Sequence, residues 1–238
     1  MVIGASGFVG RYFVEELLEE EYFDTILAID STQPRYLNTK IINLAVDVSS
    51  DKKKMHAIFD SYAVTCAFYI SEVVDTRTGW PHTQKLQKDL EGARVVGGEC
   101  ARVGIPWLSL STADSPLSPE WESVVGSNGG IALFTQGLVY GIGDILRVDR
   151  LLGCSQYGSV LVVAEQQPNN RIYIRNICKM LCMSYRRYGE SKGLLTSLTI
   201  TDPDTTHITN IEFVERVVAL CGGMRVYRVP NLLTRVLT

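Results

Sequence analysis

The sequence predicts an α/β fold in which a parallel sheet is covered by helices on both sides. Two observations support this. Short apolar segments alternate along the chain with longer segments of helical period. The short segments are apolar on both faces, as expected for parallel strands that are buried between two helical layers.

The first part of the chain supplies most of these elements. Short apolar segments predict strands over residues 1–4, 25–30, 40–48, 64–70, 106–111 and 131–136. Between them, helical periodicity predicts helices over residues 8–20, 51–62 and 83–103. The first helix gathers apolar residues on one side, namely Phe8, Val9, Phe13, Leu17 and Leu18. That helix is therefore expected to cover the sheet.

The later part of the chain is less regular. Periodicity predicts helices over residues 144–157, 174–188, 210–221 and from Pro230 onward, and a strand over 195–201. Thr209 and Glu212 have the spacing of a capping box. No linker rich in Pro, Gly or Ser divides the chain. We expect one compact unit, with a main domain at 1–143 and a small lobe at 144–238 packed on it.

The composition is that of an ordinary globular protein, 46% hydrophobic and 21% charged. The net charge of −3 gives no reason to expect a nucleic-acid partner. No apolar run approaches the roughly 20 residues of a membrane span, and we find no signal-peptide pattern.

Six scattered cysteines without a CxxC motif are expected to be small buried residues in a reducing compartment. We expect an intracellular protein, cytoplasmic or mitochondrial.

The stretch GASGFVG follows the first predicted strand and opens the first predicted helix. Its glycines allow a tight turn and a close approach of the backbone to a pyrophosphate, while the helix N-terminus supplies N–H groups. The expected phosphate-binding residues are Gly4, Ser6, Gly7, Phe8, Val9 and Gly10. The alternative is a tight strand–helix turn beside an empty pocket.

Two carboxylates end the next two predicted strands. Asp30 lies twenty residues after Gly10, where it can accept hydrogen bonds from an adenosine ribose. It would repel a 2′-phosphate and so favours NAD over NADP, although Arg35 keeps NADP open. Asp47, followed by Val48, is expected to meet the adenine.

The glycine spacing resembles that of the extended branch of the short-chain dehydrogenase superfamily. Later stretches resemble further segments of that branch, namely 68–80, 89–112, 137–144, 170–184 and 199–222. Together they are most similar to the 3β-hydroxysteroid dehydrogenase/isomerase-like group, which belongs with the NAD-dependent epimerases and dehydratases. The resemblance implies a Rossmann-type doubly wound sheet with a small C-terminal α/β lobe, NAD binding and oxidation of a secondary alcohol.

The resemblance also implies a Tyr-x-x-x-Lys helix between the strands at 106–111 and 131–136. The intervening residues 113–130 contain neither Tyr nor Lys. Only a short helix from Ser118 through Val125 is expected there. Ser111 and Thr112 occupy the position of the hydroxyls that orient the substrate carbonyl, but alone they supply no base. Other candidate bases lack a spaced partner and are expected to be surface groups: His82, Asp114, Glu120 and Glu122.

The family's homodimer usually uses the long helix and the Tyr-Lys helix. Without the latter, we expect that homodimer to be absent. The 83–103 helix would then need another cover, either the Trp121 segment or a different protein, over the residues Leu86, Leu90, Val95, Val96 and Ala101.

Three functional hypotheses follow. The first is a catalytically inactive NAD(P)-binding member that serves as a structural or accessory subunit of a larger assembly. The second is an active NAD-dependent dehydrogenase or reductase for sterol-type alcohols, with an atypical base. The third is a regulator whose partner affinity responds to NAD or NADH. Further departures favour the first, since YISE replaces HLAA at 69–72 and Arg175 replaces an acid. A missing exon would also account for the absent helix.

Overall fold

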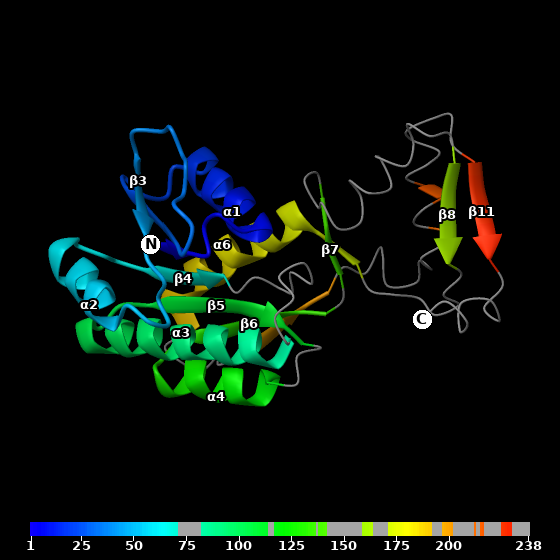
Figure 1. Cartoon of the computed structure of the whole chain (residues 1–238). Helices are drawn as coiled ribbons and strands as arrows, with labels where there is room; N and C mark the ends of the chain where they lie inside the picture. The colour runs from blue at the N-terminus through cyan, green and yellow to red at the C-terminus, as the bar shows by residue number, and fades with distance from the viewer. Residues whose placement is uncertain are drawn as a thin grey trace. The chain divides into compact units, whose positions relative to one another are not determined.

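In the computed structural model, seven parallel strands of the described residues form one sheet in the order β10-β6-β5-β4-β1-β2-β3 (Figure 1). The described residues are 1–70, 82–113, 117–136, 138–141, 159–163, 171–191, 197–201, 212, 215–216 and 225–229. The strands of this sheet are β1 Val2–Ile3, β2 Ile26–Asp30, β3 Ile41–Ala45, β4 Ala67–Ile70, β5 Trp107–Thr112, β6 Ile131–Thr135 and β10 Ser197–Ile200. The predicted parallel sheet is confirmed.

Helices cover both faces of this sheet, as the sequence predicts. Figure 1 shows α2, α3 and α4 on one face and α1 and α6 on the other. Their bounds are α1 Phe8–Glu19, α2 Lys52–Ser61, α3 His82–Val103, α4 Ser118–Ser127 and α6 Ile174–Ser191. The fold is a Rossmann-type doubly wound sheet.

Neighbouring residues of β4 show how the two layers are joined. The Phe68 ring meets Phe13 of α1 at a centroid distance of 4.7 Å and Tyr185 of α6 at 5.7 Å. The Tyr69 ring points to the opposite face, where it lies 5.8 Å from Trp121 of α4. Successive side chains of a strand alternate between faces, so these two rings bind both helical layers to the central strand.

Four short strands that the sequence analysis did not predict form two further pairs. Strand β7, Leu138–Tyr140, pairs in parallel with β9, Arg171–Tyr173. Strand β8, Ser159–Val163, pairs in parallel with β11, Arg225–Val229. The helices predicted at 144–157 and from Pro230 lie outside the described residues. So does most of 210–221, of which only residues 212, 215 and 216 are described, all in helical conformation.

The chain divides into two units, and the division differs from the contiguous one expected at residue 143. One unit comprises Met1–Thr135 and Ile174–Ile200, and the other comprises Gln136–Tyr173 and Thr201–Thr238. The chain returns to the first unit because α6 packs against α1 and β10 pairs with β6. The expected boundaries, 1–143 and 144–238, assign Ile174–Ile200 to the lobe, whereas this segment groups with the first unit.

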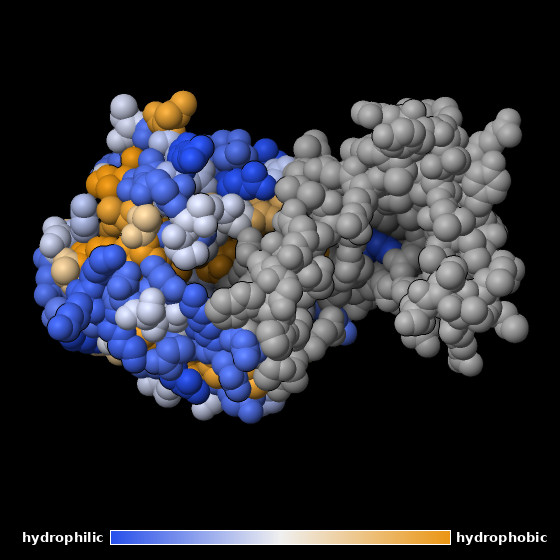
Figure 2. Space-filling model, in the orientation of Figure 1, coloured by the Kyte–Doolittle hydropathy of each residue, from blue (hydrophilic) through white to orange (hydrophobic). Residues whose placement is uncertain are grey.

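The surface of the first unit is charged over its outer helices. Figure 2 shows hydrophilic surface over α2 and α3, where Lys52 forms an ion pair of 2.7 Å with Glu91 and Arg102 one of 2.7 Å with Glu99. Exposed pairs of this kind contribute little to stability. Within the described part of the chain, no helix has the length and apolar character to cross a membrane.

Candidate dinucleotide site

Gly4 turns the chain sharply at the end of β1. Its φ of +80° lies in the left-handed region, and its N–H donates to the Ile29 carbonyl oxygen at 2.9 Å. A Cβ at this position would lie 2.2 Å from the Ile70 carbonyl oxygen of β4. Both the backbone conformation and the space therefore require glycine, as expected for the first residue of a phosphate-binding loop.

Gly10 allows α1 to pack tightly on this loop, because a Cβ there would lie 2.0 Å from the Gly4 carbonyl oxygen. Gly7 is the N-cap residue of α1, and its N–H donates to the Gly4 carbonyl oxygen at 3.1 Å. No side chain of the described residues caps this helix. The first-turn N–H groups, including those of Phe8 and Val9, can therefore serve an anion.

Asp30 ends β2 beside the glycine loop, where the sequence places it. Its Oδ2 accepts the Ser6 N–H at 3.0 Å. Its Oδ1 accepts the Ser31 hydroxyl at 3.3 Å and the Thr32 N–H at 3.2 Å. A carboxylate has roughly four lone-pair positions, so it can accept a further hydrogen bond from a ribose hydroxyl.

Asp47 follows β3 and is paired with Lys88 of α3, with 2.7 Å between Oδ2 and Nζ. The Ser49 hydroxyl also donates to Asp47 Oδ1 at 2.7 Å. Burial opposes ionisation, but the hydrogen bonds of Lys88 and Ser49 outweigh it and lower the pKa of Asp47. Val48 is buried next to it. The sequence analysis did not anticipate Lys88, which lies far along the chain from Asp47.

Tyr36 is a site residue that the sequence analysis missed. Its hydroxyl donates to the Ala5 carbonyl oxygen of the glycine loop at 2.5 Å. Its backbone is tied to Asn43 of β3. The only signal in the sequence is an aromatic residue within a polar loop, which by itself indicates no partner.

Ser111 and Thr112 end β5 at the same edge of the sheet, and both are buried. The Thr112 hydroxyl donates to the Thr135 carbonyl oxygen at 3.4 Å. The Thr112 carbonyl oxygen accepts the Ser118 hydroxyl at 3.0 Å. These contacts link β5 to β6 and to α4.

Helix α4 occupies the connection between β5 and β6. Leu117 is its N-cap residue, and the helix ends at Ser127, two residues beyond the expected end. Ser118 lies within the first turn and does not cap it. Glu120 and Glu122 are exposed, as expected. Of the other two candidate bases, Asp114 and the side chain of His82 lie outside the described residues.

Trp121 of α4 is buried against the sheet and α3. Its indole N–H donates to the Ser109 hydroxyl of β5 at 2.9 Å. Three of the five residues expected to need a cover on α3 are buried within this chain, namely Leu86, Leu90 and Val96. Val95 is half-buried and Ala101 is exposed. Leu90 and Val96 belong to the same buried cluster as Trp121.

The cysteines and Arg175, which the sequence analysis also considered, lie in the core or between helices. The described cysteines are free and buried, as predicted: Cys66, Cys100, Cys178 and Cys182. Cys154 and Cys221 lie outside the described residues. In the described ranges, no group of His, Cys, Asp or Glu side chains could hold a metal. Arg175 is the second residue of α6, and its guanidinium lies over the Tyr12 ring of α1, 5.6 Å from the ring centroid.

Solved structures confirm the fold. The UDP-glucose 4-epimerase of Thermotoga maritima aligns with a TM-score of 0.75 at 14% identity over 96% of this chain and 84% of its own. The L-threonine dehydrogenase of Clostridium difficile aligns with a TM-score of 0.77 at 10% identity over 99% and 84%. The Bordetella bronchiseptica enzyme WbmG, solved in complex with NAD, aligns with a TM-score of 0.75 at 14% identity over 96% and 80%.

The fold and the glycine loop are thus similar to those of the extended short-chain dehydrogenase and epimerase class. Within this class, residues 1–115 match the model of the 3-beta hydroxysteroid dehydrogenase/isomerase family. The family resemblance that the sequence motifs carry is confirmed.

Curated proteins show the same similarity. The 3 beta-hydroxysteroid dehydrogenase/Delta 5→4-isomerase of Vaccinia virus strain Western Reserve is 23% identical over 239 aligned positions, which cover 81% of this chain and 68% of the viral protein. The protein of the same name from Monkeypox virus is 22% identical over 235 positions, which cover 80% and 67%.

Proposed function

We propose that this chain binds a dinucleotide of the NAD type, does not oxidise alcohols, and serves as a structural or accessory subunit of a larger protein assembly. The glycine loop supports the first part of the proposal. Gly4, Gly7 and Gly10 form a turn that brings backbone N–H groups to the start of α1. Phe8 and Val9 would meet the pyrophosphate there.

The amino-acid sequence of α4 supports the proposal that the chain is inactive. This helix fills the connection that holds the Tyr-Lys pair in active relatives, and its ten residues, SPEWESVVGS, include neither. Its central aromatic residue, Trp121, is buried and hydrogen-bonded to Ser109. One side of the helix is therefore held against the core, and the helix has no Tyr-Lys pair to donate a proton to a substrate carbonyl.

The hydroxyls at the end of β5 do not replace the missing pair. An unassisted hydroxyl is far too weak an acid to work as an acid or base near neutral pH. The Thr112 hydroxyl already donates to a backbone carbonyl. Ser111 and Thr112 fit a structural role at the end of the strand.

Asp30 favours NAD over NADP. Its carboxylate would accept a ribose hydroxyl but would face the negative charge of a 2′-phosphate. A bound nucleotide that contacts only the folded chain stabilises it, by about 2.7 kcal/mol at a concentration one hundred times its Kd. In an accessory subunit the nucleotide would act in this way, as a structural ligand, in an intracellular assembly that is either cytoplasmic or mitochondrial.

An active NAD-dependent dehydrogenase or reductase is the second candidate. The names of the viral relatives favour it, since they are those of a steroid-converting enzyme. In that case Ser111 would orient the substrate carbonyl, and an atypical base would move the proton. Turnover of a sterol alcohol with NAD that is lost in Ser111→Ala would support this candidate.

The test combines thermal unfolding with a turnover assay. Thermal unfolding of the wild type and of Asp30→Ala is measured with NAD, NADH, NADP and NADPH. The control variant is Asp24→Ala, because the exposed Asp24 carboxylate lies just before the start of β2, away from Asp30. We expect a shift of several degrees with NAD or NADH in the wild type and in Asp24→Ala, a smaller one in Asp30→Ala, and no hydride transfer with 3β-hydroxysteroids. An unchanged midpoint with all four nucleotides contradicts the binding proposal, and steroid turnover contradicts the inactive one.

The accessory role needs a measurement of its own. The purified chain is expected to be monomeric in analytical ultracentrifugation, because the usual homodimer would need the missing helix. A defined partner should then bind the nucleotide-loaded chain at least fivefold more tightly than the nucleotide-free chain. A stable homodimer, or equal affinity for both forms, contradicts this part of the proposal.

A further inference from the structure

The loop between β2 and β3, residues 31–40, is held in shape by a side chain of β3. The Asn43 amide oxygen accepts the Tyr36 N–H at 3.2 Å, and the Asn43 amide nitrogen donates to the Tyr36 carbonyl oxygen at 2.8 Å. The Gln33 side chain donates to the Asn43 carbonyl oxygen at 3.3 Å. Because both backbone groups of Tyr36 are tied to one side chain, the edge of the sheet fixes where the Tyr36 ring lies.

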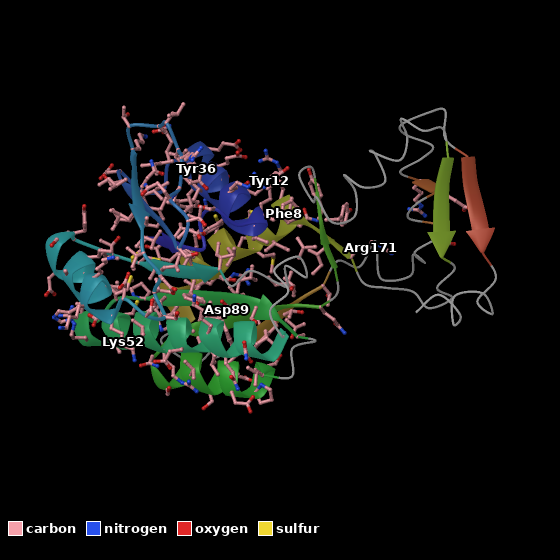
Figure 3. All side chains as sticks on the ribbon, in the orientation of Figure 1. Phe8, Tyr12, Tyr36, Lys52, Asp89 and Arg171 are labelled. Atoms are coloured by element: carbon pink, nitrogen blue, oxygen red, sulfur yellow. The ribbon has the colours of Figure 1, made fainter. Side chains whose placement is uncertain are left out.

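The Tyr36 side chain reaches from this loop to the glycine loop. Figure 3 labels Tyr36 near α1, the helix of Phe8 and Tyr12. Its hydroxyl donates to the Ala5 carbonyl oxygen at 2.5 Å. Burial raises the pKa of Tyr36 to about 12. At neutral pH the phenol therefore keeps its proton and stays a hydrogen-bond donor.

Ala5 and Ser6 are bound from this side by three contacts. In addition to the Tyr36 contact, the Ser6 N–H donates to Asp30 Oδ2 at 3.0 Å and the Ser6 hydroxyl donates to the Thr32 carbonyl oxygen at 3.3 Å. A ribose that binds Asp30 would share that carboxylate with Ser6. The Tyr36 contact involves no group expected to bind the ligand, so it can hold the glycine loop in the free and the bound protein alike.

We propose that Tyr36 is a positioning residue of the dinucleotide site: it holds the Ala5 carbonyl and thereby fixes the glycine loop in the shape that receives a pyrophosphate. This inference rests on the proposed function, because it requires that the loop binds a dinucleotide. The ligands that depend on Tyr36 are those with a pyrophosphate, such as NAD and ADP. Adenosine, which has no phosphate, should depend on it much less.

The test is calorimetric titration of the whole chain with NAD, ADP and adenosine, for the wild type, Tyr36→Phe and Tyr188→Phe. The control removes a hydrogen bond of the same type. The Tyr188 hydroxyl donates to the Gly129 carbonyl, which lies just before the start of β6 and away from the carboxyl ends of the strands. We expect Tyr36→Phe to weaken NAD and ADP five- to tenfold and adenosine less than twofold. Tyr188→Phe should leave all three affinities within twofold of the wild type.

A second variant separates positioning from folding. Asn43→Ala releases the backbone of Tyr36 but keeps the hydroxyl, so it should show the same selective loss of NAD and ADP binding, at an unchanged far-ultraviolet circular dichroism spectrum. Wild-type NAD affinity in Tyr36→Phe would overturn the inference alone. An equal loss for adenosine and ADP would also overturn it, since that would be a general structural effect. Failure of the wild type to bind any of the three ligands overturns the proposed function, and this inference with it.

Discussion

The Trp121 indole N–H donates to the Ser109 hydroxyl at 2.9 Å, inside the core between α4 and β5. Both residues are buried, Trp121 to 2% exposure and Ser109 to 0%. A buried polar pair of this kind is stable only while both partners are present. The short helix is thus held against the sheet by an aromatic side chain and one specific hydrogen bond.

Trp121→Ala is expected to lower the free energy of unfolding by about 3–5 kcal/mol, because it leaves a cavity in the core. Trp121→Phe keeps much of the ring but leaves the Ser109 hydroxyl without its donor, at an expected cost of about 1–3 kcal/mol. Urea unfolding measures both. In the double variant Trp121→Phe with Ser109→Ala, part of the loss caused by Trp121→Phe should return. If the losses of the single variants Trp121→Phe and Ser109→Ala simply added in the double variant, the hydrogen bond would not couple the two residues.

Two glycine substitutions should change stability in opposite directions. Gly4→Ala puts a Cβ at a φ of +80° and 2.2 Å from the Ile70 carbonyl oxygen, so it should destabilise the chain and abolish dinucleotide binding. A Cβ added at Gly98 of α3 would meet no neighbouring atom within 4 Å, and Gly98→Ala should raise the free energy of unfolding by about 0.5–1 kcal/mol. Thermal unfolding compares the two, and equal midpoints would contradict the account of Gly4.

The Asp47–Lys88 pair should make stability depend on pH. Its hydrogen bonds lower the pKa of Asp47 in the folded chain, so its contribution is present above the unfolded-state pKa and is lost as the pH falls through the folded-state pKa. Both side chains are partly exposed, so Lys88→Met should cost about 0.3–1 kcal/mol at pH 7 and less near pH 3. Urea unfolding across this range measures it, with the exposed Lys53→Met as control. A cost of Lys88→Met that stays constant down to pH 3 would rule out this assignment.

The buried thiols should resist alkylation in the folded chain. Burial raises the pKa of Cys66 and of Cys182 to about 12, and it also raises the pKa of Cys100 and Cys178. Only the thiolate reacts, so iodoacetamide at pH 8 should modify these four slowly until urea unfolds the protein. Peptide mass spectrometry follows each site separately. Fast labelling of Cys66 in the native chain would contradict its burial.

The sequence predicted the elements of the main sheet because their signals are local. Strand β2 and helix α1 are long enough to show their apolar pattern, and both were found within a residue or two of their observed ends. Strands β7 and β9 have three residues each, too few for a periodicity. The return of α6 to the first unit depends on its contact with α1, which no local pattern records.

The candidate site was predictable where glycine geometry and chain order fix it. Gly4 and Asp30 follow or end adjacent parallel strands, and Gly10 lies in the first turn of the helix between those strands. This order brings Asp30 beside Ser6 of the glycine loop. The partners of these residues were not predictable. Lys88 meets Asp47 across two elements, and Tyr36 meets Ala5 across a loop whose shape depends on Asn43. Such contacts follow from tertiary packing rather than from spacing.

The pairing of β10 with β6 also governs the order in which the chain can fold during synthesis. A ribosome-bound chain that ends before Ser197 has all the other strands of the main sheet, but β6 is then an unpaired edge. The Ile174–Ser191 helix, which packs on α1, emerges only shortly before this last strand. Completion of the first unit must therefore wait for a late segment of the chain, and the nascent protein exposes an open edge to chaperones and neighbouring chains until Ile200 has emerged.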